Sequence, residues 1–246
     1  MVPFHSTLNF LKRPDGSCEV TKGGTRIWCG VNGPGDIQSS KRIFDKVNIL
    51  FDINRLSATN KHLEITKSKS TNLSASTETP SKLIESVVRA AVDLAAYPRA
   101  TLQVSVQEIK CDGPSDSTLI NGICLALLDA GIQMHFPFAA LTVIKRPLVD
   151  DNATFFVKRE AGTNFEFIVE PTQSQAAKTT ATFCFVLRPS VLAQGGCALL
   201  ASDAHGRFTL QDFKQARTIA QSQCLGVFDL YRQKISEKFA RDLIRE

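Results

Sequence analysis

The sequence lacks the features that mark secreted and membrane proteins. No apolar run approaches 18 residues, and the richest one, at residues 120–128, is interrupted by Asn121 and Gly122. The first residues contain neither an apolar segment nor a small-residue cleavage site, so no secretory signal is expected. We therefore expect a soluble protein that has no membrane partner.

Groupings typical of metal, disulfide and nucleotide sites are also missing. The seven cysteines are scattered and never spaced C-x-x-C, which argues against a zinc site or a disulfide framework. Most lie among apolar residues, so we expect buried thiols in a reducing compartment. The four histidines are isolated, which favours surface or turn positions over a Cys-His or Ser-His pair. The string at residues 22–25, KGGT, lacks P-loop spacing and predicts a hairpin turn. No cofactor is expected.

Charge is present with a mild basic excess. The chain has 29 Lys+Arg against 24 Asp+Glu, a net charge of +5, which permits a polyanionic partner without requiring one. Residues 54–82 are rich in Ser, Thr and Asn and predict a long mobile loop. This segment contains two acidic residues and five basic ones: Arg55, Lys61, Lys67, Lys69 and Lys82.

Hydrophobic periodicity predicts one α+β domain over residues 1–246. Apolar residues at three- and four-residue spacing predict a helix that begins at Thr79-Pro80 and ends at Tyr97-Pro98. A second helix is expected from Ser115 or Ser117 to Gly131, and a long final helix from Thr209. Strands are expected at residues 17–21, 26–31, 47–53, 101–109, 139–145, 154–158, 165–169, 182–187 and 197–201.

Several strings, in order, carry a family resemblance. These are RPDGS (13–17), KGGT (22–25), VNGP (31–34), YPR (97–99), the Asp112-Gly113 turn, LINGICLALLDAGIQM (119–134) and EPT (170–172). Together they resemble RNase PH-type domains, over almost the whole chain except the basic loop. This resemblance implies the RNase PH fold (ribosomal protein S5 domain 2-like), with mixed β-sheets packed with helices.

Within that family, RPDGS and the ending VFDLYRQKISEKFARD look most like RNA exosome ring subunits of the ribosomal RNA-processing protein forty-six type. The forty-one type is the alternative. The resemblance implies a six-membered ring of RNase PH-like chains with S1/KH cap subunits, located in the nucleus, nucleolus and cytoplasm. It also implies a role in rRNA maturation and RNA turnover, performed by associated nucleases.

The residues that grip phosphate in active family members are replaced here. In the family, a D-G-G-T-R-T turn supplies Thr and Arg, whereas this chain has Ser115 and has Asp116 in place of the Arg. A second family Arg, in a stretch like LIGR, corresponds to Ser86, and the family acid corresponds to Ser174. Because a carboxylate repels the anion that a guanidinium binds, the resemblance implies a site that is dead for phosphorolysis. The chain is therefore expected not to be an enzyme.

Two further readings stay open. Asp112, Asp116 and Glu170 could hold a divalent metal for hydrolytic nuclease chemistry, but no further ligand at clear spacing supports this, and no metal is expected. A self-assembling homomer with a separate nucleic-acid role is the other. The basic loop is the best candidate for binding RNA, since in the family it lines the central channel. A solvated loop without contacts is the alternative.

Overall fold

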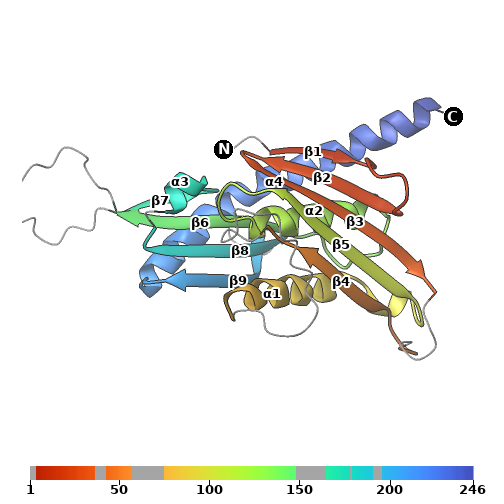
Figure 1. Ribbon diagram of the computed structural model, residues 1–246, viewed down its shortest axis with the longest axis horizontal. Coiled ribbons are helices and arrows are strands. Elements are labelled where there is room, and N and C mark those ends of the chain that lie inside the picture. Colours follow the sequence, from red (N-terminus) through yellow and green to blue (C-terminus); the bar gives the residue numbers. More distant parts are fainter. Residues whose placement is uncertain are drawn as a thin grey trace, which may run out of the picture.

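Two β-sheets lie side by side, with one helix between them and a long helix behind (Figure 1). The computed structural model describes residues 4–36, 43–56, 75–147, 165–177, 179–190 and 196–245. The five-stranded sheet has the order β1-β2-β3-β5-β4, and the four-stranded sheet has the order β7-β6-β8-β9. The strands are β1 (Phe4–Leu8), β2 (Gly16–Lys22), β3 (Thr25–Gly35), β4 (Asn48–Asn54), β5 (Thr101–Lys110), β6 (Ala139–Pro147), β7 (Phe165–Val169), β8 (Ala181–Pro189) and β9 (Cys197–Gly206). The helices are α1 (Ala75–Ala91), a 3₁₀ turn η2 (Leu94–Ala96), α2 (Asp116–Asp129), α3 (Gln173–Ala176) and α4 (Leu210–Arg245).

In the first sheet β5, a strand from the middle of the chain, lies between β3 and β4. β2 and β3 form an antiparallel hairpin in which Lys22 pairs with Thr25, and Gly23 supplies the positive φ of the turn. β5 then lies antiparallel to β3 and parallel to β4. The alternating apolar residues of β5, Leu102, Val104 and Val106, are buried.

Helix α2 is buried around nearly its whole circumference because both sheets and α4 pack against it. Asn121 satisfies two backbone groups of Ala140 on β6, donating to its carbonyl (2.9 Å) and accepting from its N–H (2.7 Å). Gly122 allows close approach to β3, since a Cβ there would lie 2.7 Å from Cys29 Sγ. The Asn-Gly pair, which normally marks a turn, therefore serves packing here.

Helix α4 closes the core from behind. Ala216, Ala220, Cys224, Val227 and Tyr231 on one of its faces are buried, and its last turns project beyond β1 (Figure 1). Among the described residues, no helix is long and apolar enough to cross a membrane. All seven cysteines are free, and six are buried, as expected.

Most predicted elements are confirmed, but the boundaries of the first helix are wrong. It begins at Ala75 rather than Thr79 and ends at Ala91 rather than Tyr97. The chain leaves the helix there because Val92 forms a β-bridge with Met134 and Asp93 caps the 3₁₀ turn. β1 and α3 are additional elements. The strand expected at residues 154–158 lies outside the described residues, as do residues 57–74 of the basic loop.

Candidate functional site

The turn before α2 is packed against the turn after β7. Gly113 has a φ of +105°, and a Cβ there would lie 2.9 Å from the Pro171 carbonyl oxygen, so this position requires glycine. The Asp112 N–H donates to Thr25 Oγ1 (3.0 Å), and its carboxylate accepts from the Gln173 N–H (3.2 Å). Three motifs that are distant in sequence, KGGT, Asp-Gly and EPT, thus meet at one place.

Ser115 and Asp116, at the start of α2, are each bound by another side chain of the protein. Asp116 lies in the first turn, where its negative charge is favoured by the helix dipole. Its Oδ1 lies 2.7 Å from Arg55 Nη1, and these side chains are 27% and 17% exposed. The Ser115 hydroxyl donates to Glu108, whose other carboxylate oxygen accepts from the Leu56 N–H (2.8 Å). The Asp116 carboxylate and the Ser115 hydroxyl are therefore already paired within the protein.

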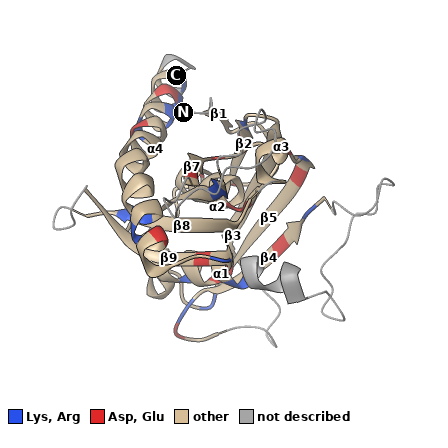
Figure 2. Cartoon of the chain, turned by 90° about the vertical axis from the view of Figure 1, so that its left-hand side faces the viewer, with Lys and Arg blue, Asp and Glu red and all other residues tan. Residues whose placement is uncertain are grey.

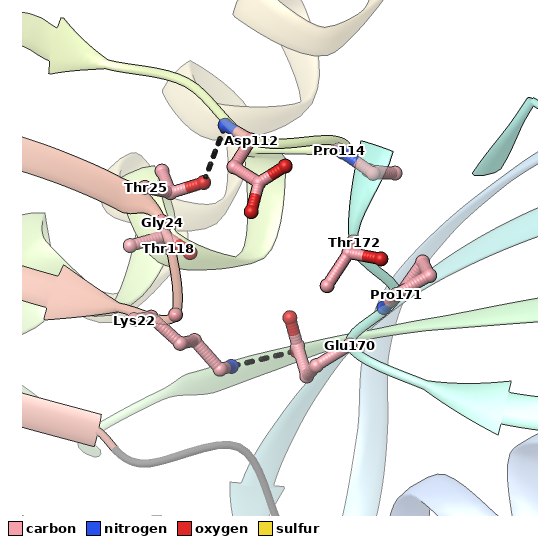
Figure 3. A pocket seen from close by; sticks show the side chains of 10 residues that line it. Lys22, Gly24, Thr25, Asp112, Pro114, Thr118, Glu170, Pro171 and Thr172 are labelled. Carbon is pink, nitrogen blue, oxygen red and sulfur yellow. Dashed lines mark hydrogen bonds and ion pairs between the residues drawn. The ribbon is translucent and has the colours of Figure 1, made fainter. Parts of the chain in front are cut away.

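Glu170 is the second charged centre of the site. Lys22 Nζ reaches from the end of β2 to within 2.7 Å of Glu170 Oε1 (Figure 3), and the side chains are 6% and 9% exposed. Ser117 Oγ donates to Oε2 (3.0 Å) and the Thr142 N–H donates to Oε1 (3.0 Å). Glu170 also has a φ of +56°. The carboxylate that follows β7 is thus fully engaged inside the protein.

The space that remains between these groups is small. A pocket of about 20 Å³ is lined by Lys22, Thr25, Asp112 and Glu170 together with the two turns (Figure 3). Such a volume holds about one water molecule.

Ser86 and Ser174, at the positions of the second family Arg and the family acid, make local hydrogen bonds. The Ser86 hydroxyl donates to the Lys82 carbonyl of its own helix (2.8 Å). Ser174 Oγ lies 3.0 Å from Thr172 Oγ1, at the start of the short helix α3. Both hydroxyls therefore form hydrogen bonds within their own helix or with its N-cap residue.

The three carboxylates that were weighed as metal ligands have separate partners. Asp116 pairs with Arg55, Glu170 pairs with Lys22, and Asp112 accepts from the Gln173 N–H. In the part of the chain that the structure describes, no group of three or more His, Cys, Asp or Glu could hold a metal ion. These carboxylates are thus held apart by their own contacts.

The residues predicted to bind RNA fall into three groups. Lys61, Lys67 and Lys69 lie outside the described residues. Lys82 is exposed on α1. The placement of Arg55 in a mobile loop is wrong, because the residue follows β4 directly and pairs with Asp116. Over the described residues, basic and acidic side chains are interspersed, on α4 as on the strands (Figure 2).

Sequence reasoning missed two charged residues of the site, Lys22 and Glu108. Glu108 did leave a signal. It continues the alternation of Leu102, Val104 and Val106 on the buried face of β5, where a carboxylate is unexpected. A charged residue at an inward position of a strand predicts a buried partner, and here that partner is the Ser115 hydroxyl.

A mixed five-stranded sheet and an antiparallel four-stranded sheet, packed around one buried helix, form the architecture of an RNase PH-type protein. The chain belongs to the 3′ exoribonuclease family, because the model of domain 1 of that family (RNase_PH) matches residues 2–133, more than half of the chain.

The individual relatives are exosome components. The chain is 27% identical over 235 residues to the exosome complex component RRP46 homolog of Caenorhabditis elegans, covering 96% of this chain and 94% of that protein. It is 34% identical over 149 residues to the putative exosome complex component RRP41 of the same organism, covering 59% and 60%. The crystal structure of rice Rrp46 matches with a TM-score of 0.71 at 18% identity, over 96% of this chain and 95% of that one. That structure supports the fold.

Proposed function

We propose that this protein is a non-catalytic subunit of the RNA exosome ring, which supports 3′-to-5′ RNA processing by associated nucleases. Its similarity along nearly the whole chain to a relative named as an exosome complex component supports the assembly. The single observation that carries the loss of catalysis is the Arg55–Asp116 ion pair at the start of α2, at 2.7 Å.

The charge at the start of α2 disfavours phosphorolysis. Phosphorolysis requires a phosphate anion held beside an RNA end, ordinarily at free N–H groups and guanidinium groups at a helix N-terminus. Here Asp116 presents a carboxylate at that end, and Ser115 donates its hydroxyl to Glu108. A second anion would face like charge and would have to break existing hydrogen bonds.

The remaining roles follow from the same assignment. We propose one RNase PH-like domain whose neighbours are other RNase PH-like chains in a six-membered ring, with S1/KH subunits above it. Lys61, Lys67 and Lys69 bind RNA phosphates non-specifically. The affinity for RNA therefore falls as the salt concentration rises. The compartments are the nucleus, including the nucleolus, and the cytoplasm.

A degradation assay on the full chain tests the catalytic part. A 3′-labelled single-stranded RNA is incubated with the purified protein and inorganic phosphate, and nucleoside diphosphates are measured. We expect no release above the level without protein, with an active RNase PH as the positive control. Release that disappears on Ser115→Ala would overturn the proposal, and so would RNA shortening that depends on Mg²⁺ or Mn²⁺.

A binding assay tests the assembly. The full chain is co-expressed with other RNase PH-like exosome subunits, and the purified material is analysed by size-exclusion chromatography with mass determination. We expect a stable complex that contains this chain. A chain that elutes only as a monomer or only as a homomer in the presence of those subunits contradicts the proposal.

A further inference from the structure

Asn-Gly pairs occur at residues 32–33, near the end of β3, and at residues 121–122, inside α2. In such a pair the backbone nitrogen of the glycine can attack the side-chain carbonyl carbon of the asparagine, because glycine has no side chain to obstruct the approach. The reaction requires an asparagine side chain that is free to turn toward that nitrogen, and it requires water. The two pairs of this chain differ in both respects.

The pair at Asn121 meets neither requirement. Asn121 is 0% exposed, its Nδ2 donates to the Ala140 carbonyl (2.9 Å), and its Oδ1 accepts from the Ala140 N–H (2.7 Å) and the Tyr231 hydroxyl (2.9 Å). Turning this side chain would break all of these hydrogen bonds in the core. We therefore expect Asn121 to stay unmodified.

The pair at Asn32 meets both requirements. Asn32 is exposed, and among the described residues no hydrogen bond holds its side-chain amide. It lines a groove of about 240 Å³ on the face of the five-stranded sheet that carries Trp28 and Gln107, with Leu11 and Pro14 at the side. Solvent therefore reaches the amide.

The fold itself requires the glycine of this pair. Gly33 has a φ of +114°, and a Cβ there would collide with the Thr101 carbonyl oxygen. The pairing of β3 with β5 is irregular at this point: Asn32 lies opposite Gln103, and the next paired residue is Gly35, opposite Thr101. Gly33 thus lies in a break of the ladder, where no residue of β5 pairs with it.

Asp15 holds the nitrogen that would react. The Gly33 N–H donates to Asp15 Oδ2 (2.7 Å), and this contact is exposed. The nitrogen must lose its proton in order to attack, whereas a carboxylate favours the protonated N–H and opposes a negative charge on the nitrogen. The contact therefore slows the reaction without preventing it, since an exposed hydrogen bond outside the ladder opens readily.

We propose that Asn32 is a site of deamidation and that Asp15 sets its rate. Hydroxide takes the proton of the Gly33 N–H, and the nitrogen forms a bond to Asn32 Cγ. The bond between Cγ and Nδ2 breaks, and Nδ2 takes a proton from water and leaves as ammonia. Water then adds to one of the two carbonyl carbons of the succinimide and opens it to an aspartyl or an isoaspartyl residue.

The product changes the surface of the sheet. The residues that line the groove are all uncharged, so the reaction brings a carboxylate into it and lowers the net charge of +5 by one. An isoaspartyl residue also lengthens the main chain by a carbon atom, just before the break in the ladder. Aged molecules therefore differ from newly made ones in charge and in backbone at this groove.

Peptide mapping by mass spectrometry measures both Asn-Gly pairs in the same molecules. The purified full chain is incubated at physiological temperature, from neutral to mildly alkaline pH. We expect deamidation with isoaspartyl product at Asn32, at a rate that rises with the hydroxide concentration, and none at Asn121 over the same interval. An Asn32 that stays intact while a synthetic peptide of residues 26–36 deamidates overturns the proposal. Equal modification of Asn121 also overturns it, because the reaction then takes place in unfolded chains.

Substitution of Asp15 tests the control of the rate. Asp15→Ala removes the acceptor of the Gly33 N–H, and we expect deamidation at Asn32 to become about tenfold faster. Asp15→Asn keeps an acceptor oxygen without the charge and gives a rate between those of Asp15→Ala and the natural chain. Asp52→Ala removes a carboxylate from an exposed position of β4 outside the groove and leaves the rate unchanged. In each variant Asn121 reports any unfolding. If Asp15→Ala deamidates no faster than the natural chain, Asp15 does not control the site.

Discussion

Lys22 and Glu170 join the two sheets across the site by an ion pair of 2.7 Å in which neither side chain is more than 9% exposed. The pair ties the end of β2 to the turn after β7, two segments that lie almost 150 residues apart in the chain. Its partners Ser117 and the Thr142 N–H satisfy the remaining capacity of the carboxylate.

Removing one member of this pair is expected to be costly. Lys22→Met leaves a buried carboxylate without its cation, and we expect the free energy of unfolding to fall by about 3–5 kcal/mol. Urea denaturation measures the change. Glu166→Gln, which breaks the more exposed pair with Arg146, is the control and costs less than about 1 kcal/mol. A Lys22→Met chain as stable as the natural one contradicts the description of the site.

Freeing Arg55 is expected to create an anion site. Within the described residues its Nε and Nη2 atoms are buried without hydrogen-bond partners, and Asp116 neutralises its charge. In Asp116→Asn the guanidinium faces the start of α2 without a carboxylate, so phosphate should bind and raise the melting temperature. Phosphate at ten times its Kd contributes about 1.4 kcal/mol of stability. Asp52→Asn, an exposed position on β4, is the matched control and gains no phosphate response. A phosphate response of the natural chain equal to that of Asp116→Asn contradicts the view that Asp116 blocks the site.

The pH dependence of stability is expected to report on Asp212. The hydrogen bond from Lys145 holds the pKa of Asp212 below its ordinary value of 3.8, helped by the Thr209 N–H. Because the pKa is lower in the folded protein, the stabilisation is complete above pH 3.8 and is lost as the pH falls through the folded value. We expect Asp212→Asn to unfold more easily than the natural chain at pH 6, by about 1–2 kcal/mol, and the difference to be smaller near pH 2. Denaturant titrations at both pH values measure the difference. A constant difference between the two pH values contradicts this assignment.

The hydroxyl of Tyr231 is expected to contribute to stability through Asn121. It donates to Asn121 Oδ1 (2.9 Å), and burial raises the pKa of Tyr231 well above its ordinary value. Tyr231→Phe removes this bond without changing the packing, and we expect a loss of about 1–2 kcal/mol by urea denaturation. Thr218→Val, which removes an exposed hydroxyl of α4, is the comparison and changes stability by less than about 0.5 kcal/mol. Equal effects of the two substitutions would mean that the Tyr231 hydroxyl has no special role.

The elements with clear periodicity could be predicted from the sequence. β7 was expected at residues 165–169 and is found there, and the final helix begins within one residue of Thr209. The first helix is shorter at its C-terminal end than its apolar pattern predicts, because Val92 pairs with Met134 instead of continuing the helix. A bridge between residues so far apart leaves no local pattern.

The candidate site could be predicted only in part. The turns at Asp112-Gly113 and Glu170-Pro171 are recognisable in the sequence, and the structure brings them together. The partner of each charge could not be predicted, because Arg55 and Asp116 are 61 residues apart. A carboxylate in place of a cation is visible in one sequence, whereas the cation that neutralises it is visible only in the fold.

The position of β5 between β3 and β4 has a consequence for synthesis on the ribosome. β3 and β4 both pair with β5, so neither can complete its hydrogen bonds until residue 110 has left the ribosomal tunnel. The apolar faces of these strands stay uncovered during that interval, and the core closes only after Tyr231 of α4 has been made. The nascent chain therefore exposes apolar surface until α4 has been made.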